Sequence, residues 1–178
     1  LCWGGYRLPF SHAGNCGIII EMLDEKEFSM KKAVIVYAST HHGNTKKLVD
    51  AISQKFAATL IDTTQHTHAD LTDYDLIGFA SGIDFGKFYD SVEQFLRDNL
   101  PKNKQVFFLY TCAMAKDSFT KSVRNEAQKQ DAVILGEYGC RGFNTYGPWK
   151  LIGGMNKGHP TENEIAGAVH FVGNLLNP

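Results

Sequence analysis

The sequence predicts an α/β fold in which helices cover both faces of a parallel β-sheet. Short apolar runs alternate with amphipathic helical patterns from residue 33 to the end, as expected for successive β-α-β units. The runs are apolar at consecutive positions, which is typical of strands buried on both faces. A chain of 178 residues is long enough for one domain with a large core and short for two.

Five parallel strands are predicted. Four buried runs lie at residues 33–38, 76–80, 106–110 and 132–135, and the weaker run Ala58–Ile61 is expected at an edge of the sheet. Successive strands are separated by connections that are mostly helical and long enough to cross over the sheet. Such crossovers, which are right-handed, make the strands parallel.

Helices are predicted over residues 44–56, 90–100, 118–130 and 162–176. Leu48, Ile52 and Phe56 share one face of the first helix, which is therefore expected to pack on the sheet. The segment 118–130 is mostly polar, and the last helix opens with a capping box from Thr161 to Glu164.

Met30 separates two kinds of sequence. Residues 1–29 are irregular and rich in glycine and aromatic residues, whereas a buried-strand pattern begins just after Met30. We interpret 1–29 as an N-terminal extension, from cloning or a misplaced start, and 30–178 as the domain. The alternative is a true N-terminal strand near Gly17–Glu21, added to an edge of the sheet.

Composition excludes several classes of protein. The formal net charge is −1, which gives no sign of a nucleic-acid or membrane surface. No run approaches the roughly 20 apolar residues of a membrane span, and Ile18–Ile20 is too short for a signal-peptide core. We therefore expect a cytoplasmic protein.

The four cysteines include no CxxC pair, which argues against a zinc site, a thioredoxin-like motif or a disulfide framework. Cys112 and Cys140 are expected to be small buried apolar side chains.

Ligands of doubly wound sheets bind beyond the carboxyl ends of the strands. There the first strand is followed by Ser39-Thr-His-His-Gly-Asn-Thr45 and a helix, so hydroxyls, backbone N–H groups and a helix N-terminus predict a phosphate site. The ATP/GTP pattern GxxxxGK[ST] and the dinucleotide pattern GxGxxG are absent. The alternatives are a capping turn without a ligand and, with less support, a metal site at His41 and His42.

Residues 37–45, Tyr-Ala-Ser-Thr-His-His-Gly-Asn-Thr, resemble the flavodoxin signature, a strand followed by S/T-x-T-G-N-T and a helix. The order of elements over residues 31–176 is similar too. The resemblance implies a three-layer flavodoxin-like fold with sheet order 2-1-3-4-5 and one bound FMN. By motif match, the FMN phosphate is held by Thr40, Gly43, Asn44 and Thr45 and by backbone N–H groups of His41 and His42, and we add the neighbouring Ser39. His42 departs from the motif, since it replaces a hydroxyl residue.

The same resemblance places two further loops against the flavin. One side of the isoalloxazine is expected to be covered by Ser81, Gly82, Ile83, Asp84, Phe85 and Gly86. Gly82 and Gly86 would supply positive φ, and a carbonyl near one of them would accept the N5–H. A stacking surface for the flavin is offered by Phe85, Phe88 and Tyr89. The alternative is that these side chains pack in the core, which is favoured more for Tyr89 than for Phe85. Backbone N–H groups of Thr111, Cys112 and Ala113 are expected at the O2, N3 and O4 edge.

The fourth loop, residues 139–160, is long and rich in glycine and aromatic residues. The loop after residue 110 lacks the stacking tyrosine of familiar flavodoxins. We hypothesise that Trp149 or Tyr146 replaces it and that Arg141 or Lys150 faces a partner. A lid without a redox role is the alternative.

Three functions follow from this pattern. The leading hypothesis is an electron carrier between redox partner proteins, monomeric or weakly dimeric, although a near-neutral charge gives little steering. The second is an FMN-dependent NAD(P)H quinone or protoporphyrinogen oxidoreductase. The third is a flavin-free α/β binding module. A phospho-receiver is rejected, because Ser39-Thr40 and Ser81-Gly82 stand where it needs acidic residues.

Overall fold

The computed structural model describes residues 31–114, 118–147, 151 and 153–177. Residues 1–29, Met30, Trp149 and Lys150 lie outside the described residues, so the proposed N-terminal boundary and the stacking role of Trp149 stay predictions. In chain order, the elements are β1 (Ala33–Ala38), α1 (Asn44–Phe56), β2 (Thr59–Asp62), β3 (Leu76–Asp84), β4 (Lys87–Phe88), α2 (Asp90–Asn99), β5 (Gln105–Cys112), α3 (Lys121–Lys129), β6 (Val133–Arg141) and α4 (Glu162–Leu176).

The main sheet is parallel, with the strand order β2-β1-β3-β5-β6. When the parallel strands are counted alone, this is the predicted order 2-1-3-4-5, and the weak run 58–61 forms the edge strand β2, as expected. The short strand β4 was not predicted. It pairs antiparallel with the end of β3, through Ile83 with Phe88 and Asp84 with Lys87, and two residues are too few to show a pattern in sequence.

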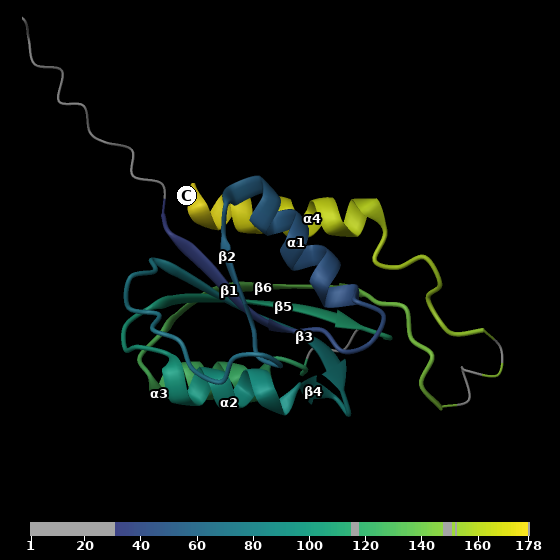
Figure 1. The fold of residues 1–178 in the computed structure, drawn as a ribbon, viewed down its shortest axis with the longest axis horizontal. Coiled ribbons are helices and arrows are strands. Elements are labelled where there is room, and N and C mark those ends of the chain that lie inside the picture. Colours follow the sequence, from purple (N-terminus) through teal and green to yellow (C-terminus); the bar gives the residue numbers. More distant parts are fainter. Residues whose placement is uncertain (1–30, 115–117, 148–150, 152, 178) are drawn as a thin grey trace, which may run out of the picture.

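Helices cover both faces of the sheet, with α1 and α4 on one side and α2 and α3 on the other (Figure 1). On the first side, Leu48 and Ile52 of α1 are fully buried with Phe107 of β5. On the second, Phe79 and Phe108 pack in a cluster that includes residues of α2 and α3. The central strands are therefore buried on both faces, as their continuous apolar runs predict. Among the described residues, none of the helices has the length and apolar character to cross a membrane.

Three strands extend further than their apolar runs indicate. β3 continues to Asp84, β5 to Cys112 and β6 to Arg141, so much of the predicted loop segments is strand. Ladder pairing continues through Gly82 with Thr111 and through Thr111 with Cys140. Polar residues and glycine weaken the sequence signal for a strand, but neighbouring strands supply hydrogen bonds that override it.

The start of α4 is fixed by the predicted capping box. The Thr161 side chain accepts a hydrogen bond from the Glu164 N–H at 3.3 Å, and the Glu164 carboxylate accepts from the Thr161 N–H at 2.7 Å and from His159 Nδ1 at 2.8 Å. Partial burial opposes ionisation, but these hydrogen bonds hold the pKa of the Glu164 carboxyl below its ordinary value. The end of the long loop is thereby anchored to the helix that follows it.

The packing of α1 on the sheet can be tested with Ile52→Ala. Because Ile52 is fully buried, the substitution is expected to lower the free energy of unfolding by about 2–5 kcal/mol. The measurement is urea denaturation followed by circular dichroism, in which the midpoint should fall at constant slope. Gln54→Ala, on the exposed side of α1, is the control and should change stability by less than about 0.5 kcal/mol. Equal effects at the two positions would contradict this packing.

Candidate functional site

A cavity of about 200 Å³ opens at the carboxyl ends of β1, β3 and β5, where ligands of doubly wound sheets bind. We call it the strand-end cavity. The predicted residues that line it are Ser39, Thr40, His41, Asn44, Thr45, Gly82, Ile83, Asp84, Phe85, Thr111, Cys112 and Ala113. Tyr89, Gly142, Phe143, Asn144 and Tyr146 complete the lining.

Of the described residues predicted to bind FMN in the three loops, four do not line the strand-end cavity: His42, Gly43, Ser81 and Gly86. A second, larger groove lies between α1 and α4, but it contains none of the predicted residues. Within the described ranges, no group of three or more His, Cys, Asp or Glu is placed to hold a metal ion.

The loop after β1 presents backbone donors at the N-terminus of α1. His42 and Gly43 both have left-handed backbone, with φ of 56° and 63°, and no side chain caps the helix. The Lys46 N–H donates to Ser39 Oγ at 3.2 Å, whereas the N–H groups of His42, Gly43 and Thr45 donate to no protein atom in the part of the chain that is described. Unpaired donors at a helix start form a site for an anion such as a phosphate.

Two polar side chains connect this loop to the rest of the cavity. Thr45 Oγ1 lies 2.9 Å from Thr111 Oγ1 in a buried hydroxyl pair, which ties α1 to β5. Asn44 is buried, and its Nδ2 donates to the Phe143 carbonyl at 2.8 Å. The Asn44 Oδ1 is buried without a partner among the described residues. A buried acceptor of this kind normally has a donor, and a hydroxyl of the ribityl chain of FMN is a group of the required type.

The end of β3 and β4 form a hairpin whose tip is Phe85-Gly86. Both tip residues have positive φ, 45° and 84°, as a two-residue hairpin turn requires. The Phe85 side chain is 85% exposed, and its ring lies edge-on to the ring of Tyr146 with centroids 6.1 Å apart.

The prediction of positive φ is right for Gly86 and wrong for Gly82. At Gly82 the reason for glycine is space, because a β-carbon would lie 2.9 Å from the Tyr89 hydroxyl. The buried Ser81 hydroxyl accepts a hydrogen bond from the Tyr89 N–H at 2.9 Å and donates one to the Gly82 carbonyl at 2.6 Å. These two hydrogen bonds stabilise the hairpin.

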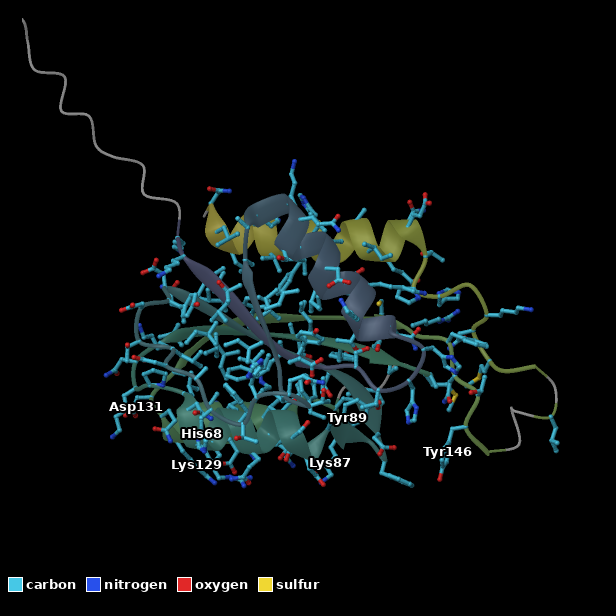
Figure 2. All side chains as sticks on the ribbon, viewed as in Figure 1. His68, Lys87, Tyr89, Lys129, Asp131 and Tyr146 are labelled. Carbon is cyan, nitrogen blue, oxygen red and sulfur yellow. The ribbon has the colours of Figure 1, made fainter. Side chains whose placement is uncertain are left out.

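The aromatic residues of the hairpin divide between the cavity and the core. Phe85 and the half-buried Tyr89 line the strand-end cavity. Phe88 is fully buried and packs edge-on against Phe108 at 6.2 Å, so its predicted place in a stacking surface is wrong. Figure 2 shows Tyr89 near the base of β4 and Tyr146 further out, on the long loop beyond the strands.

Residues 142–146, which we call the outer wall, close the side of the strand-end cavity next to α1. Asn144 exchanges backbone hydrogen bonds with Met155 at 3.0 and 2.8 Å, and Asn156 Nδ2 donates to the Ala113 carbonyl at 2.6 Å. Gly142 must be small, since a β-carbon would lie 2.8 Å from Asn44 Nδ2. The long loop thus lies beside the predicted phosphate loop.

Gly142, Phe143 and Asn144 were not among the predicted site residues. The available signal was their position, directly after the last strand, in a loop rich in aromatic residues and glycine.

Both described cysteines are free and buried, as predicted. Cys112 Sγ donates to the Cys140 carbonyl at 3.6 Å. Burial raises the pKa of the Cys112 thiol, and burial together with the nearby Glu164 carboxylate raises the pKa of Cys140 to about 12. Both therefore remain thiols at neutral pH and are poor nucleophiles.

Comparison with known proteins agrees with this geometry. The family model of the flavodoxin domain matches residues 34–136. An uncharacterized protein of Methanocaldococcus jannaschii is 39% identical over 147 residues, which cover 82% of this chain and 98% of that protein.

Solved flavodoxins share the fold. A flavodoxin from the domain Archaea superposes with a TM-score of 0.57 at 13% identity, over 78% of this chain and 92% of that one. Oxidised Flavodoxin 2 from Bacillus cereus superposes with a TM-score of 0.56 at 15% identity, over 78% of this chain and 94% of that one. The family match, the sheet order and the phosphate loop together show that this chain belongs to the flavodoxin family, whose cofactor, FMN, fits the donors and acceptors of the strand-end cavity.

Proposed function

We propose that this protein binds FMN in the strand-end cavity and carries electrons between partner proteins. The observation that carries the proposal is the apolar surface around the cavity. Large exposed apolar side chains in the described part of the chain are Phe85, Met114, Tyr146, Leu151 and Val133. Phe85 and Tyr146 line the cavity, and Met114 directly follows the lining residue Ala113. A cluster of exposed apolar side chains marks an interaction site.

We propose a place for each part of FMN. The unpaired N–H groups at the start of α1, with the Thr40 hydroxyl, would hold the phosphate. Asn44 Oδ1 would accept a hydrogen bond from the ribityl chain. Phe85, Tyr89 and Tyr146 would contact the ring system. When bound, FMN supplies the one- and two-electron chemistry, while the protein supplies binding, orientation and electrostatics.

The charge of the chain favours recognition by apolar contact. With a formal net charge of −1, the protein has no strong field to steer a basic partner. We expect redox partners to dock on the apolar residues around the cavity, with electron-transfer rates that depend weakly on ionic strength. We also expect the protein to be a monomer or a weak dimer that leaves this surface free.

The second candidate is an FMN-dependent oxidoreductase of a quinone or of protoporphyrinogen. The exposed pair of Phe85 and Tyr146, with ring centroids 6.1 Å apart, could contact a planar apolar substrate. Burial raises the pKa of the nearby Cys112 thiol, so this thiol would not act as a base in such a reaction. A flavin-free module is less consistent with the unpaired N–H groups and with the buried Asn44 Oδ1.

The phosphate site can be tested with Thr40→Val. When apoprotein is titrated with FMN, binding should change the two visible absorption bands of the oxidised flavin relative to free FMN. A hydrogen bond to a charged group contributes about 1.5–3 kcal/mol, so the variant should bind FMN roughly 10- to 150-fold more weakly. Riboflavin lacks the phosphate, and its affinity should be unchanged.

Thr67→Val removes an exposed threonine hydroxyl away from the cavity and serves as the matched control. Equal losses of FMN and riboflavin affinity in Thr40→Val would place the phosphate elsewhere. A colourless wild-type protein that does not bind FMN would overturn the proposed function.

Steady-state kinetics distinguish the carrier from the reductase. The FMN-loaded protein with NADH or NADPH and a soluble quinone should turn over more slowly than about 1 s⁻¹, the low end for typical enzymes. The same protein, reduced chemically, should pass electrons to a one-electron acceptor such as ferricyanide. Turnover of 1–1,000 s⁻¹ with a nicotinamide donor would instead favour the oxidoreductase.

A further inference from the structure

We propose that His42 is a positioning residue: its side chain holds the outer wall of the cavity against the flavin ring and does not contact the phosphate. The inference rests on the proposed binding of FMN. Where the flavodoxin signature has a hydroxyl residue, this chain has an imidazole, and the structure directs that imidazole away from the anion site.

The contacts of His42 all lie on the outer wall. Its Nε2 is 2.8 Å from Thr145 Oγ1, a residue 103 positions later in the chain. Its ring lies against the ring of Phe143, with centroids 4.5 Å apart and planes tilted by 46°. The side chain does not line the strand-end cavity, although those of its neighbours His41 and Asn44 do.

The backbone explains why the side chain of His42 points to the wall. With φ of 56°, His42 has the left-handed conformation that a β-carbon disfavours, and Gly43 follows with φ of 63°. Glycine would adopt this conformation without strain. The two contacts with the wall therefore offset an unfavourable backbone, and the same conformation leaves the N–H groups of His42 and Gly43 without protein partners.

A continuous set of contacts leads from the phosphate loop to the ring site. Asn44 Nδ2 donates to the Phe143 carbonyl at 2.8 Å, beside the contacts of His42. Further along the wall, the Tyr146 N–H donates to Asn144 Oδ1 at 2.7 Å. The Tyr146 ring then meets Phe85 at the hairpin tip, 6.1 Å away. Loss of the His42 side chain would loosen the wall but leave the backbone donors of the anion site in place.

This role makes a specific prediction for two ligands. If His42 positions the wall, its removal lowers the affinities for FMN and riboflavin by the same factor, because both ligands have the ring system. If His42 binds the phosphate, its removal lowers the affinity for FMN alone. We expect dissociation constants for both ligands to rise about tenfold, in proportion to the loss of one ring contact and one hydrogen bond.

The experiment uses His42→Gly, which removes the side chain and relieves the backbone, so that failure to fold is not expected. His66→Ala, at an exposed histidine that does not line the cavity, is the control. Flavin titrations are accompanied by visible spectra and midpoint potentials of the bound flavin, both of which should shift. His42→Gln retains a donor for Thr145 and should recover part of the affinity. Thr145→Val added to His42→Gly should cause little further loss, because the two residues share one hydrogen bond.

A second measurement does not depend on flavin. In the apoprotein, hydrogen exchange at the Phe143 and Tyr146 amides should be several-fold faster in His42→Gly than in the wild type. Loss of FMN affinity alone, or unchanged affinity, spectra and exchange, would overturn the inference. If the wild type binds no flavin, the proposed function fails as well, and unchanged exchange would separately show that His42 does not hold the wall.

Discussion

The hydrogen bond from the buried Asn44 side chain to the Phe143 carbonyl is the interaction on which the site depends. It joins the first residue of α1 to a loop 99 positions later and fixes two sides of one cavity at once. It also constrains its surroundings, since Gly142 must lack a β-carbon for the amide to approach. Because Nδ2 is used for this bond, Oδ1 remains a buried acceptor for a ligand.

The parts of the fold that follow from chain order could be predicted from the sequence. Continuous apolar runs predict the parallel strands. The Ser39–Thr45 loop leads directly into a helix, so its predicted anion site depends only on neighbouring residues and can be recognised from a short stretch of sequence. Parallel strands end at one edge of the sheet, which brings this loop to Gly82 and Thr111 without any further signal. Strand ends were less predictable, because Ser81 and Cys140 pair through neighbours that a local pattern does not contain.

The outer wall could not be predicted because its contacts are neither local nor periodic. His42 departs from the flavodoxin signature, and from sequence this departure looks like a lost phosphate contact. Its partners Phe143 and Thr145 are about a hundred residues away, in a loop whose glycines permit many paths. The β-hairpin has the same difficulty, since the space at Gly82 is limited by the Tyr89 side chain, a contact that the local sequence does not reveal.

The proposed way of holding the anion affects the surface around the cavity. Backbone N–H groups and hydroxyls would form the proposed phosphate site, and no lysine or arginine of the described residues lines the cavity. Among the described residues, Asp84 brings a carboxylate to the cavity lining, and Phe85 and Tyr146 expose apolar rings beside it. Phe85 has the left-handed backbone that the hairpin turn requires, and its ring is 85% exposed at the hairpin tip. An exposed aromatic ring at the edge of the cavity would be a contact point for the redox partner that we propose.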